Sequence, residues 1–370
     1  MYRKTWLEVN LDAIEDNVRT IHAICGKRFI AVLKADAYGC GDIEVANAVL
    51  RAGADMLAVS SLDEAMMLRN QGCNAEILIL GATDPKDASL MEKENITVAA
   101  YSPEFVAALA ESGCTGLKVH LAVDTGMTRI GFRSLDDSKA ALHTLLNTGA
   151  KVTGIFTHFS CSDFDPAFTD RQYEIFASTV KGLEYSFDWI HCDNSDATVY
   201  FRDPVSNACR VGIALYGIST YKNDLKRPLS FYSTIIMVKQ AHEGDKVGYG
   251  ATYTAKEGEW IATVPVGYAD GFIRANQGRH VYVDGEMCEI VGRVCMDQMM
   301  IRLPHAMPVG TKVELFGEHI RLEDMAKDLN TIPYEIICLI SGRVTRTYVE
   351  NGKVIGEANE RLTKSINAGE

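Results

Sequence analysis

The chain has 370 residues, 47% of them hydrophobic and 23% charged, and a formal net charge of −12 at pH 7. This length suffices for one large and one smaller globular domain. The acidic balance argues against non-specific binding to nucleic acids or anionic membranes, although a few clustered arginines could still bind an anionic ligand.

The sequence shows no feature of a membrane or exported protein. No apolar run reaches the roughly 20 residues of a transmembrane helix, and the start MYRKTWLEVN lacks the apolar core of a signal peptide. The ten cysteines include no C-x-x-C pair, so neither a zinc site nor a disulfide framework is indicated. We therefore expect reduced thiols, no metal and a cytoplasmic location.

The first elements are a short strand over 6–9 and a helix for which Asn10 is a candidate N-cap. The helix has an apolar face and ends at Gly26. A regular alternation of apolar runs and helix-like stretches follows, which is typical of a (β/α)₈ barrel. The eight strand-like runs are 29–34, 56–60, 77–80, 96–100, 117–123, 152–157, 188–192 and 208–213.

The pattern changes after about Leu229. The segment HVYVDGEMCEIVGRV predicts a hairpin around Asp284 and Gly285. TKVELFGEHI predicts another strand pair, and little helix is expected apart from Leu322 to Leu329. We therefore expect a (β/α)₈ barrel over 11–229, followed by a mostly β domain over 230–370.

The stretch FIAVLKADAYGC contains the most informative residue. Its apolar run ends at Lys34, and Gly39 and Gly41 allow a sharp turn. A desolvated lysine at the end of a strand can lose its proton and attack a carbonyl to form a Schiff base. The alternative is a structural lysine whose ammonium reaches solvent.

Other polar residues follow later barrel strands, where working groups of such barrels cluster. Ser195 with the backbone of Gly212 and Ile213 would suit a phosphate group. Taken singly, His158 could be a core histidine, Arg129 and Arg210 could form ordinary ion pairs, and Gly212 could serve strand packing. The candidates at this rim are Lys34, Arg129, His158, Asn194, Ser195, Arg210, Gly212 and Ile213.

The run VLKADAYG resembles the pyridoxal-phosphate (PLP) lysine motif of the alanine racemase family. Further segments are similar to that family, in the family's order, and extend the resemblance from about Trp6 to Arg346. The resemblance implies that the first strand, within 1–10, joins the β domain. The other segments are VDTGMTRIG, THF, NS, RVGIALYG, YGATYTA, VGYADG and GRVCMDQ.

The resemblance assigns roles around a PLP cofactor. Lys34 would carry it, and Tyr38, His158, Asn194, Ser195, Gly212 and Ile213 would help to bind it. Arg210 would face the pyridine nitrogen, where a permanent cation disfavours a proton on the ring and favours reprotonation at Cα over transamination.

Racemisation needs an acid or base on each face of Cα. Lys34 would serve one face, and the resemblance implies Tyr249 of the partner subunit for the other, with His158 and Arg210 stabilising its phenolate. A homodimer with shared sites follows. Arg129 resembles the arginine that binds the substrate carboxylate. Met296 and Tyr268 match residues that the family contributes across the interface, although alone they would suggest core and strand-end positions.

Two positions depart from the family pattern. Ala122 stands where many members have a lysine, often carbamylated, so Arg129 must be held by another group. Gly342 stands where many members have a second tyrosine near the phosphate. Both departures bear on the choice of substrate.

The expected function is a PLP-dependent alanine racemase that supplies D-alanine for peptidoglycan. A serine or broad-specificity amino-acid racemase is the alternative. A decarboxylase fits less well, because the chain lacks the glycine run after a barrel strand with which such enzymes bind phosphate. A PLP-binding homeostasis protein without turnover would resemble a lone barrel, and a Schiff-base aldolase would explain Lys34 but not Arg210 with Ser195.

Overall fold

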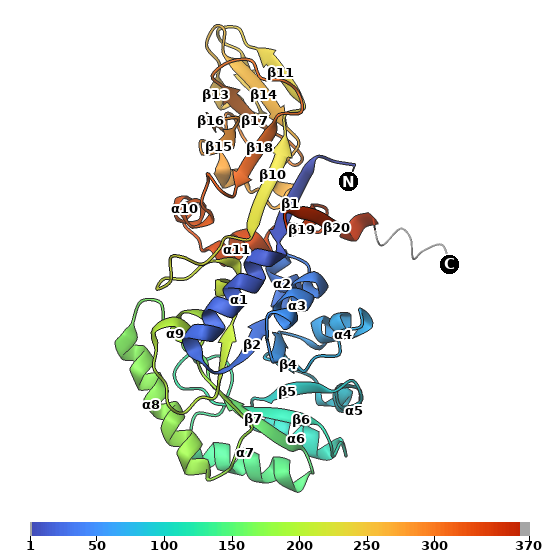
Figure 1. Ribbon diagram of the computed structural model, residues 1–370, viewed down its shortest axis with the longest axis vertical. Helices are drawn as coiled ribbons and strands as arrows, with labels where there is room; N and C mark the ends of the chain where they lie inside the picture. Colours follow the sequence, from blue (N-terminus) through green and yellow to red (C-terminus); the bar gives the residue numbers. More distant parts are fainter. Residues whose placement is uncertain (1, 363–370) are drawn as a thin grey trace, which may run out of the picture. The chain divides into compact units, whose positions relative to one another are not determined.

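A closed barrel of eight parallel strands makes up the first part of the fold. The computed structural model describes residues 2–362, and the barrel runs from blue to green in Figure 1. The ring closes where its last strand pairs with its first, with Ile30 opposite Arg210. Each strand lies within two residues of an apolar run of the sequence, which confirms the predicted barrel. Its strands are β2 (Arg28–Val32), β3 (Met56–Val59), β4 (Ile77–Ile79), β5 (Ile96–Ala100), β6 (Lys118–Ala122), β7 (Lys151–Phe156), β8 (Trp189–His191) and β9 (Ala208–Val211).

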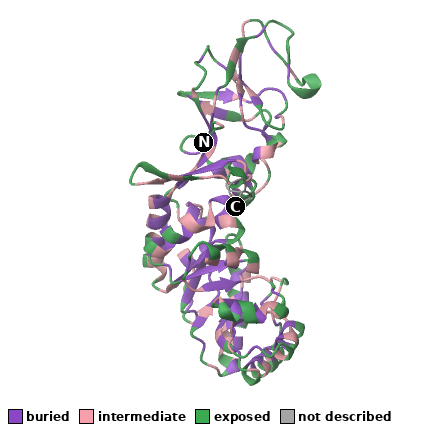
Figure 2. Cartoon of the chain, turned by 90° about the vertical axis from the view of Figure 1, so that its right-hand side faces the viewer, coloured by how far each residue is buried: buried purple, intermediate pink, exposed green. Residues whose placement is uncertain are grey.

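Helices surround the barrel, and several begin at a serine side chain. Ser61, Ser102 and Ser134 each accept a hydrogen bond from the amide three residues later, which satisfies one of the first helical N–H groups. Figure 2 shows buried strands inside and exposed outer faces on the helices. The helices are α1 (Leu11–Cys25), α2 (Lys34–Gly39), α3 (Asp42–Arg51), α4 (Leu62–Asn70), α5 (Ala88–Lys93), α6 (Pro103–Glu111), α7 (Leu135–Asn147), α8 (Pro166–Leu183) and α9 (Ser195–Tyr200), with 3₁₀ turns η1 (Pro85–Asp87) and η2 (Ile213–Tyr216).

A second, mostly β part contains the N-terminal strand β1 (Thr5–Asn10). Leu7 lies opposite Phe231 in an antiparallel pair and opposite Arg346 in a parallel pair, so β1 is a central strand of a seven-stranded sheet. Asn10 then caps α1 by accepting a bond from Ala13 N at 2.9 Å. The further strands are β10 (Leu229–Thr234), β11 (Met237–Gln240), β12 (Lys246–Val247), β13 (Tyr253–Thr254), β14 (Trp260–Val264), β15 (His280–Val283), β16 (Glu286–Glu289), β17 (Met299–Leu303), β18 (Lys312–Phe316), β19 (Thr345–Glu350) and β20 (Lys353–Ala358).

The hairpin around Asp284 and Gly285 is confirmed, since β15 and β16 pair there and both turn residues have positive φ. The strand pair predicted for 311–320 is wrong. Only β18 forms, because the buried Glu314 carboxylate accepts bonds from His319 N (2.7 Å) and Ile320 N (2.9 Å) and folds the segment into a turn.

The helix predicted near Leu322 is present as α10 (Leu322–Asp328). A second short helix, α11 (Pro333–Cys338), was not predicted. Three 3₁₀ turns also lie in this part: η3 (Tyr249–Ala251), η4 (Tyr268–Asp270) and η5 (Arg274–Asn276).

The chain divides into two compact units. The barrel unit comprises Ile14–Ala37 and Asp42–Lys226, and the β unit comprises the described parts of Met1–Ala13, Tyr38–Gly41 and Arg227–Glu370. The domain boundary at 229 and 230 stays a prediction. Within the described residues, no helix is long and apolar enough to cross a membrane.

Candidate active site

The predicted rim residues all follow barrel strands or end them. Lys34 comes two residues after β2, Arg129 lies in the loop after β6, and His158 comes two residues after β7. Because parallel strands of a closed barrel end at one rim, these groups face the same side of the barrel. Direct contacts join Arg210 to His158 and Ser195 to Gly212. Lys34 and Arg129 are exposed in this chain.

The segment after Lys34 forms a left-handed turn. Four consecutive non-glycine residues, from Ala35 to Tyr38, have φ between 50° and 59°. This conformation costs roughly 1–2 kcal/mol per L-residue, so it needs support from elsewhere. Glu64 Oε1 accepts a bond from Ala35 N (2.8 Å), and Tyr216 Oη donates to Ala37 O (2.7 Å). The turn expected from Gly39 and Gly41 therefore begins earlier, at Ala35, a residue without conformational preference for it.

Arg210 is buried and held on two sides by histidines. One guanidinium nitrogen, Nη1, donates to His191 Nδ1 at 2.8 Å, and Nη2 donates to His158 Nδ1 at 2.8 Å and to Thr157 O at 2.8 Å. Burial lowers the pKa of Arg210 to about 10, so the group stays charged at neutral pH. Since a guanidinium only donates, both Nδ1 atoms must accept.

Both histidines are therefore neutral. Burial, followed by the charge of Arg210, lowers the pKa of His158 and His191 well below the ordinary value. The geometry fixes the tautomer of His191, because its Nδ1 accepts and its Nε2 must then carry the hydrogen. The guanidinium of Arg210 is therefore a cation whose orientation is set by two uncharged acceptors.

The chain of bonds extends to a third histidine. His191 Nε2 lies 2.9 Å from His120 Nδ1, so His120 in turn carries its hydrogen on Nε2. That atom is buried and has no hydrogen-bond partner among residues 2–362. Gly154 gives the ring its space, since a Cβ there would lie 2.5 Å from His120 Cδ2.

Sequence reasoning missed His120 and His191. Each sits in a barrel strand (KVHLA and WIH) whose other buried residues are apolar, and each is fully buried. A polar residue in such a run was the available signal, since buried polar groups need partners.

Ser195 and Gly212 lie together, as a phosphate site requires. Ser195 Oγ accepts bonds from Gly212 N at 3.0 Å and Ala214 N at 3.4 Å. Neither bond uses the hydroxyl hydrogen, which is available to an anionic ligand. Ile213 begins the 3₁₀ turn η2, whose first amides favour negative charge.

Asn194 has a structural role that its motif did not reveal. It is the N-cap of α9, and its Oδ1 accepts bonds from Ala197 N (3.1 Å) and Ser162 Oγ (2.7 Å). Its Nδ2 donates to Phe159 O at 3.3 Å. The side chain therefore orients the start of α9, and with it Ser195.

Tyr38 belongs to the β unit and is buried. Burial raises the pKa of its phenol, so it remains protonated and can only donate to an anion.

Tyr249, Met296 and Tyr268 also belong to the β unit, and their exposed fractions are 70%, 52% and 41%. Tyr249 lines a cavity of about 750 Å³ within that unit.

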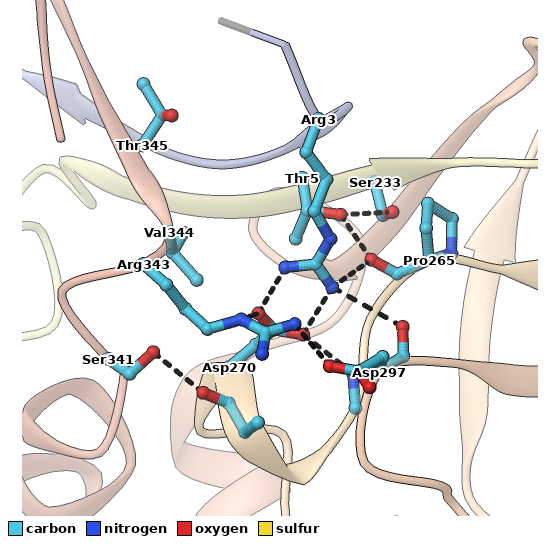
Figure 3. Close-up of polar contacts among 12 residues, drawn as sticks. Arg3, Thr5, Ser233, Pro265, Asp270, Asp297, Ser341, Arg343, Val344 and Thr345 are labelled. Carbon is cyan, nitrogen blue, oxygen red and sulfur yellow. Dashed lines mark hydrogen bonds and ion pairs between the residues drawn. The ribbon is translucent and has the colours of Figure 1, made fainter. Parts of the chain in front are cut away.

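An ionic cluster fixes the turn that carries Tyr268. The buried Asp270 carboxylate pairs with Arg3 and, at 2.8 Å, with Arg343 Nε, while Arg343 Nη2 lies 2.6 Å from Asp297 Oδ1 (Figure 3). Asp270 also accepts a bond from Gly267 N at 2.9 Å. This arrangement closes the turn.

The same turn is joined to the segment of Met296. Tyr268 N donates to Cys295 O (3.1 Å) and Ala269 N donates to Met296 O (3.0 Å). The two exposed side chains, Tyr268 and Met296, are therefore held by one rigid backbone unit.

The two departures from the family pattern have clear surroundings. Ala122 is buried with Ala99 and Phe156 in an apolar cluster, so nothing polar from this position reaches Arg129. Gly342 has ordinary backbone, since its φ is not positive, and a Cβ there would meet the carboxylate of the exposed Glu360.

One group of described side chains has the geometry of a metal site: Cys192, Asp193 and Asp203. Lys27 Nζ lies 2.8 Å from Asp193 Oδ2 and 3.1 Å from Asp203 Oδ2. The one ammonium already pairs with both carboxylates, so this group is an ion-pair cluster.

Comparisons with known proteins agree along almost the whole chain. The alanine racemase N-terminal domain matches residues 9–220, and the alanine racemase C-terminal domain matches residues 229–348. The chain is 44% identical over 362 residues to an alanine racemase of Streptococcus pyogenes serotype M1, covering 94% of this chain and 99% of the relative.

Solved structures give the same result. Alanine racemase from Bacillus anthracis has a TM-score of 0.94 and 39% identity, covering 98% of this chain and 99% of that chain. A histidine racemase from Leuconostoc mesenteroides subsp. sake has a TM-score of 0.89 and 32% identity, covering 94% of this chain and 99% of that one. The chain belongs to the alanine racemase family.

Proposed function

We propose that the protein is a PLP-dependent alanine racemase of the cytoplasm that supplies D-alanine for peptidoglycan. The observation that carries the proposal is Arg210, a buried cation between the neutral His158 and His191 at the rim where Lys34 follows β2. The 44% identity to a curated alanine racemase supports it.

The residues present fit a phosphorylated cofactor. Ser195, held by the Gly212 amide, keeps a hydroxyl hydrogen for an anion, and the amide of Ile213 lies at the start of a 3₁₀ turn. Lys34 provides an amine for the aldehyde, and Tyr38 provides a protonated phenol. Bound PLP would stabilise negative charge at the Cα atom of an amino acid, which makes its α-proton removable.

Arg210 determines which atom takes up a proton once the negative charge has formed. Its guanidinium is always charged and can only donate a hydrogen bond, so beside the pyridine nitrogen of bound PLP it would disfavour a proton on that nitrogen. Negative charge would then stay at Cα, where a proton is returned. A carboxylate in this position would have the opposite effect.

Two side chains exchange the proton with Cα. Lys34 serves one face, and Tyr249 of the partner subunit serves the other. Arg129 binds the substrate carboxylate with its guanidinium. The high exposure of Tyr249, Met296 and Tyr268 supports a homodimer in which these residues complete the partner's site.

Alanine is the substrate that the relatives favour, and serine racemisation is the second candidate. The specific observation is Gly342, which lacks the ring and hydroxyl that many family members place near the phosphate. The similarity to a histidine racemase supports testing larger substrates as well.

The test is a racemisation assay with PLP and a panel of L-alanine, L-serine and L-histidine. Alanine should react fastest and serine measurably. Borohydride should abolish both the activity and the visible absorbance of the lysine-bound cofactor. No turnover of any amino acid would refute the proposal, and a faster reaction with histidine than with alanine would refute the substrate.

A further inference from the structure

Two cysteines far apart in sequence meet where the barrel closes. Cys25 is the last residue of α1, and Cys209 lies on β9. Their sulfur atoms are 3.5 Å apart. Phe29, four residues after Cys25, pairs directly with Cys209 in the β2–β9 ladder. The thiol pair therefore lies at the seam between the first and the last barrel strand.

The two thiols differ in their access to solvent. Cys209 is fully buried, whereas Cys25 is half-buried and lines a pocket of about 430 Å³. Lys27, Asp193 and Asp203 form part of the polar wall of this pocket. A small polar molecule can therefore approach Cys25 first, and Cys209 can be reached only through its partner sulfur.

The contact also shifts the pKa values of the two thiols in opposite directions. A hydrogen bond from the Cys209 thiol to Cys25 Sγ lowers the pKa of Cys25, and burial opposes this effect. The same bond, with burial, raises the pKa of Cys209. Cys25, which lines the pocket and has the lowered pKa, is therefore the nucleophile, and the buried Cys209 retains its proton.

We propose that Cys25 and Cys209 form a peroxide-oxidation site that produces an intrachain disulfide. The Cys25 thiolate attacks one oxygen of hydrogen peroxide, the O–O bond breaks, and hydroxide leaves, which converts Cys25 to a sulfenic acid. Cys209 then attacks the oxidised sulfur, the S–O bond breaks, and the leaving hydroxide takes the Cys209 proton as water. The sum is two thiols and one peroxide giving one disulfide and two waters.

The required movement is small. A disulfide bond is about 2.05 Å long, so the sulfur atoms must approach by about 1.5 Å. Cys25 is at a helix end and is followed by Gly26 at φ 61°, where the chain adjusts at low cost. The product would link the segment before β2 to β9 and close the barrel covalently. Formation of this disulfide does not depend on the proposed racemase function.

The test uses the intact PLP-bound protein. Reduced protein is treated with one to a few equivalents of hydrogen peroxide, its remaining thiols are blocked with a maleimide, and peptides are mapped by mass spectrometry. The expected product joins the peptides of Cys25 and Cys209, has lost two hydrogens, and disappears with dithiothreitol. The oxidised protein should also unfold at a higher temperature, because the link constrains the unfolded chain.

Variants separate the two roles. Cys209→Ser should accumulate a sulfenic acid at Cys25 that dimedone traps, and Cys25→Ser should form no link. Cys338→Ser is the matched control, because it removes an exposed thiol and should leave the link intact. If Cys25→Ser fails to fold, Cys25→Ala replaces it. If neither variant folds, the peptide map of the wild-type protein decides the test.

Oxidation of Cys338 or Cys295 while Cys25 and Cys209 remain blockable thiols would overturn the proposal. So would a link confined to two different chains. Accumulation of higher oxides at Cys25 in wild-type protein, without a link, would show that Cys209 is not the resolving thiol and would equally overturn it.

Discussion

Replacement of Gly154 by alanine tests the histidine chain behind Arg210. The new Cβ would lie 2.5 Å from Cδ2 and 2.6 Å from Cγ and Nε2 of His120. An ordinary contact needs about 3.5 Å, so the buried ring must move by about 1 Å. The 2.9 Å bond to His191 would then stretch beyond hydrogen-bond range.

The expected loss in the free energy of unfolding has two contributions. Overpacking a buried site costs about 1–3 kcal/mol, and leaving the His191 N–H buried without a partner costs about 1–3 kcal/mol more. We therefore expect Gly154→Ala to destabilise the protein by about 2–6 kcal/mol. His191 would also no longer be held in place as an acceptor for Arg210, with a loss of up to about 100-fold in kcat/KM.

A double-mutant cycle with His120→Ala tests whether the new methyl group acts through the His120 ring. In the double variant the methyl group occupies space that the ring has left, so the overpacking cost is absent, and the His191 N–H loses its partner only once. The double variant should therefore be more stable than the sum of the single changes predicts, by about 2–6 kcal/mol. Urea unfolding at one fixed protein and PLP concentration measures this, since bound cofactor or subunits shift every midpoint.

Gly356→Ala is the matched control. Its Cβ would meet nothing nearer than Tyr348 Cδ2 at 4.0 Å, so its effect should stay within about 0.5 kcal/mol. Additive effects of Gly154→Ala and His120→Ala, within about 0.5 kcal/mol, would refute the steric reasoning. Unchanged activity of Gly154→Ala would refute the link to Arg210.

The remaining predictions concern the proposed catalytic groups. Lys34→Ala should lose racemisation and the borohydride-sensitive visible band, and a variant that keeps both would exclude Lys34 as the cofactor lysine. Tyr249→Phe should make solvent-deuterium exchange from the two alanine enantiomers strongly unequal, whereas equal losses would argue against a base for one face. Mixing Lys34→Ala with Tyr249→Phe subunits should restore activity, because one site of each mixed dimer has both residues intact; no recovery after verified subunit exchange would mean that each site is built from one chain. Gly342→Tyr should lower the serine-to-alanine ratio of kcat/KM by about 10- to 200-fold. Its backbone accepts a side chain once Glu360 moves, and Gly342→Ala is the control; an unchanged ratio would remove Gly342 from specificity.

The barrel could be predicted because its signals are local. Each strand is a short apolar run, as in MLAV of β3 and ITVAA of β5, where every residue is buried. Serine caps mark the helix starts. The hairpin at Asp284 and Gly285 was visible for the same reason, because those two residues accept the left-handed conformation of its turn.

The errors arose where distant groups decide the local structure. The strand expected after β18 is replaced by a turn that the Glu314 carboxylate organises. The short helix α11 was missed although Pro333 at its first position was an available start signal.

The site was predictable in its residues and less so in its supports. The resemblance supplied Arg210 and His158, but their bonds to each other follow from the fold. His191 and His120 act from inside the barrel and belong to no motif. A sequence shows which groups are unusual, and only the packing shows which of them touch.

The left-handed turn after Lys34 has a consequence for protein chemistry. Its four residues together cost about 4–8 kcal/mol relative to right-handed backbone, which approaches the whole stability of many proteins. The strain arises from L-chirality alone, so the mirror-image residue would remove it. Semisynthesis with D-alanine in place of Ala35 or Ala37 should stabilise the fold by roughly 1–2 kcal/mol per position. A chain whose relatives act on alanine thus contains two backbone positions where D-alanine is the better building block.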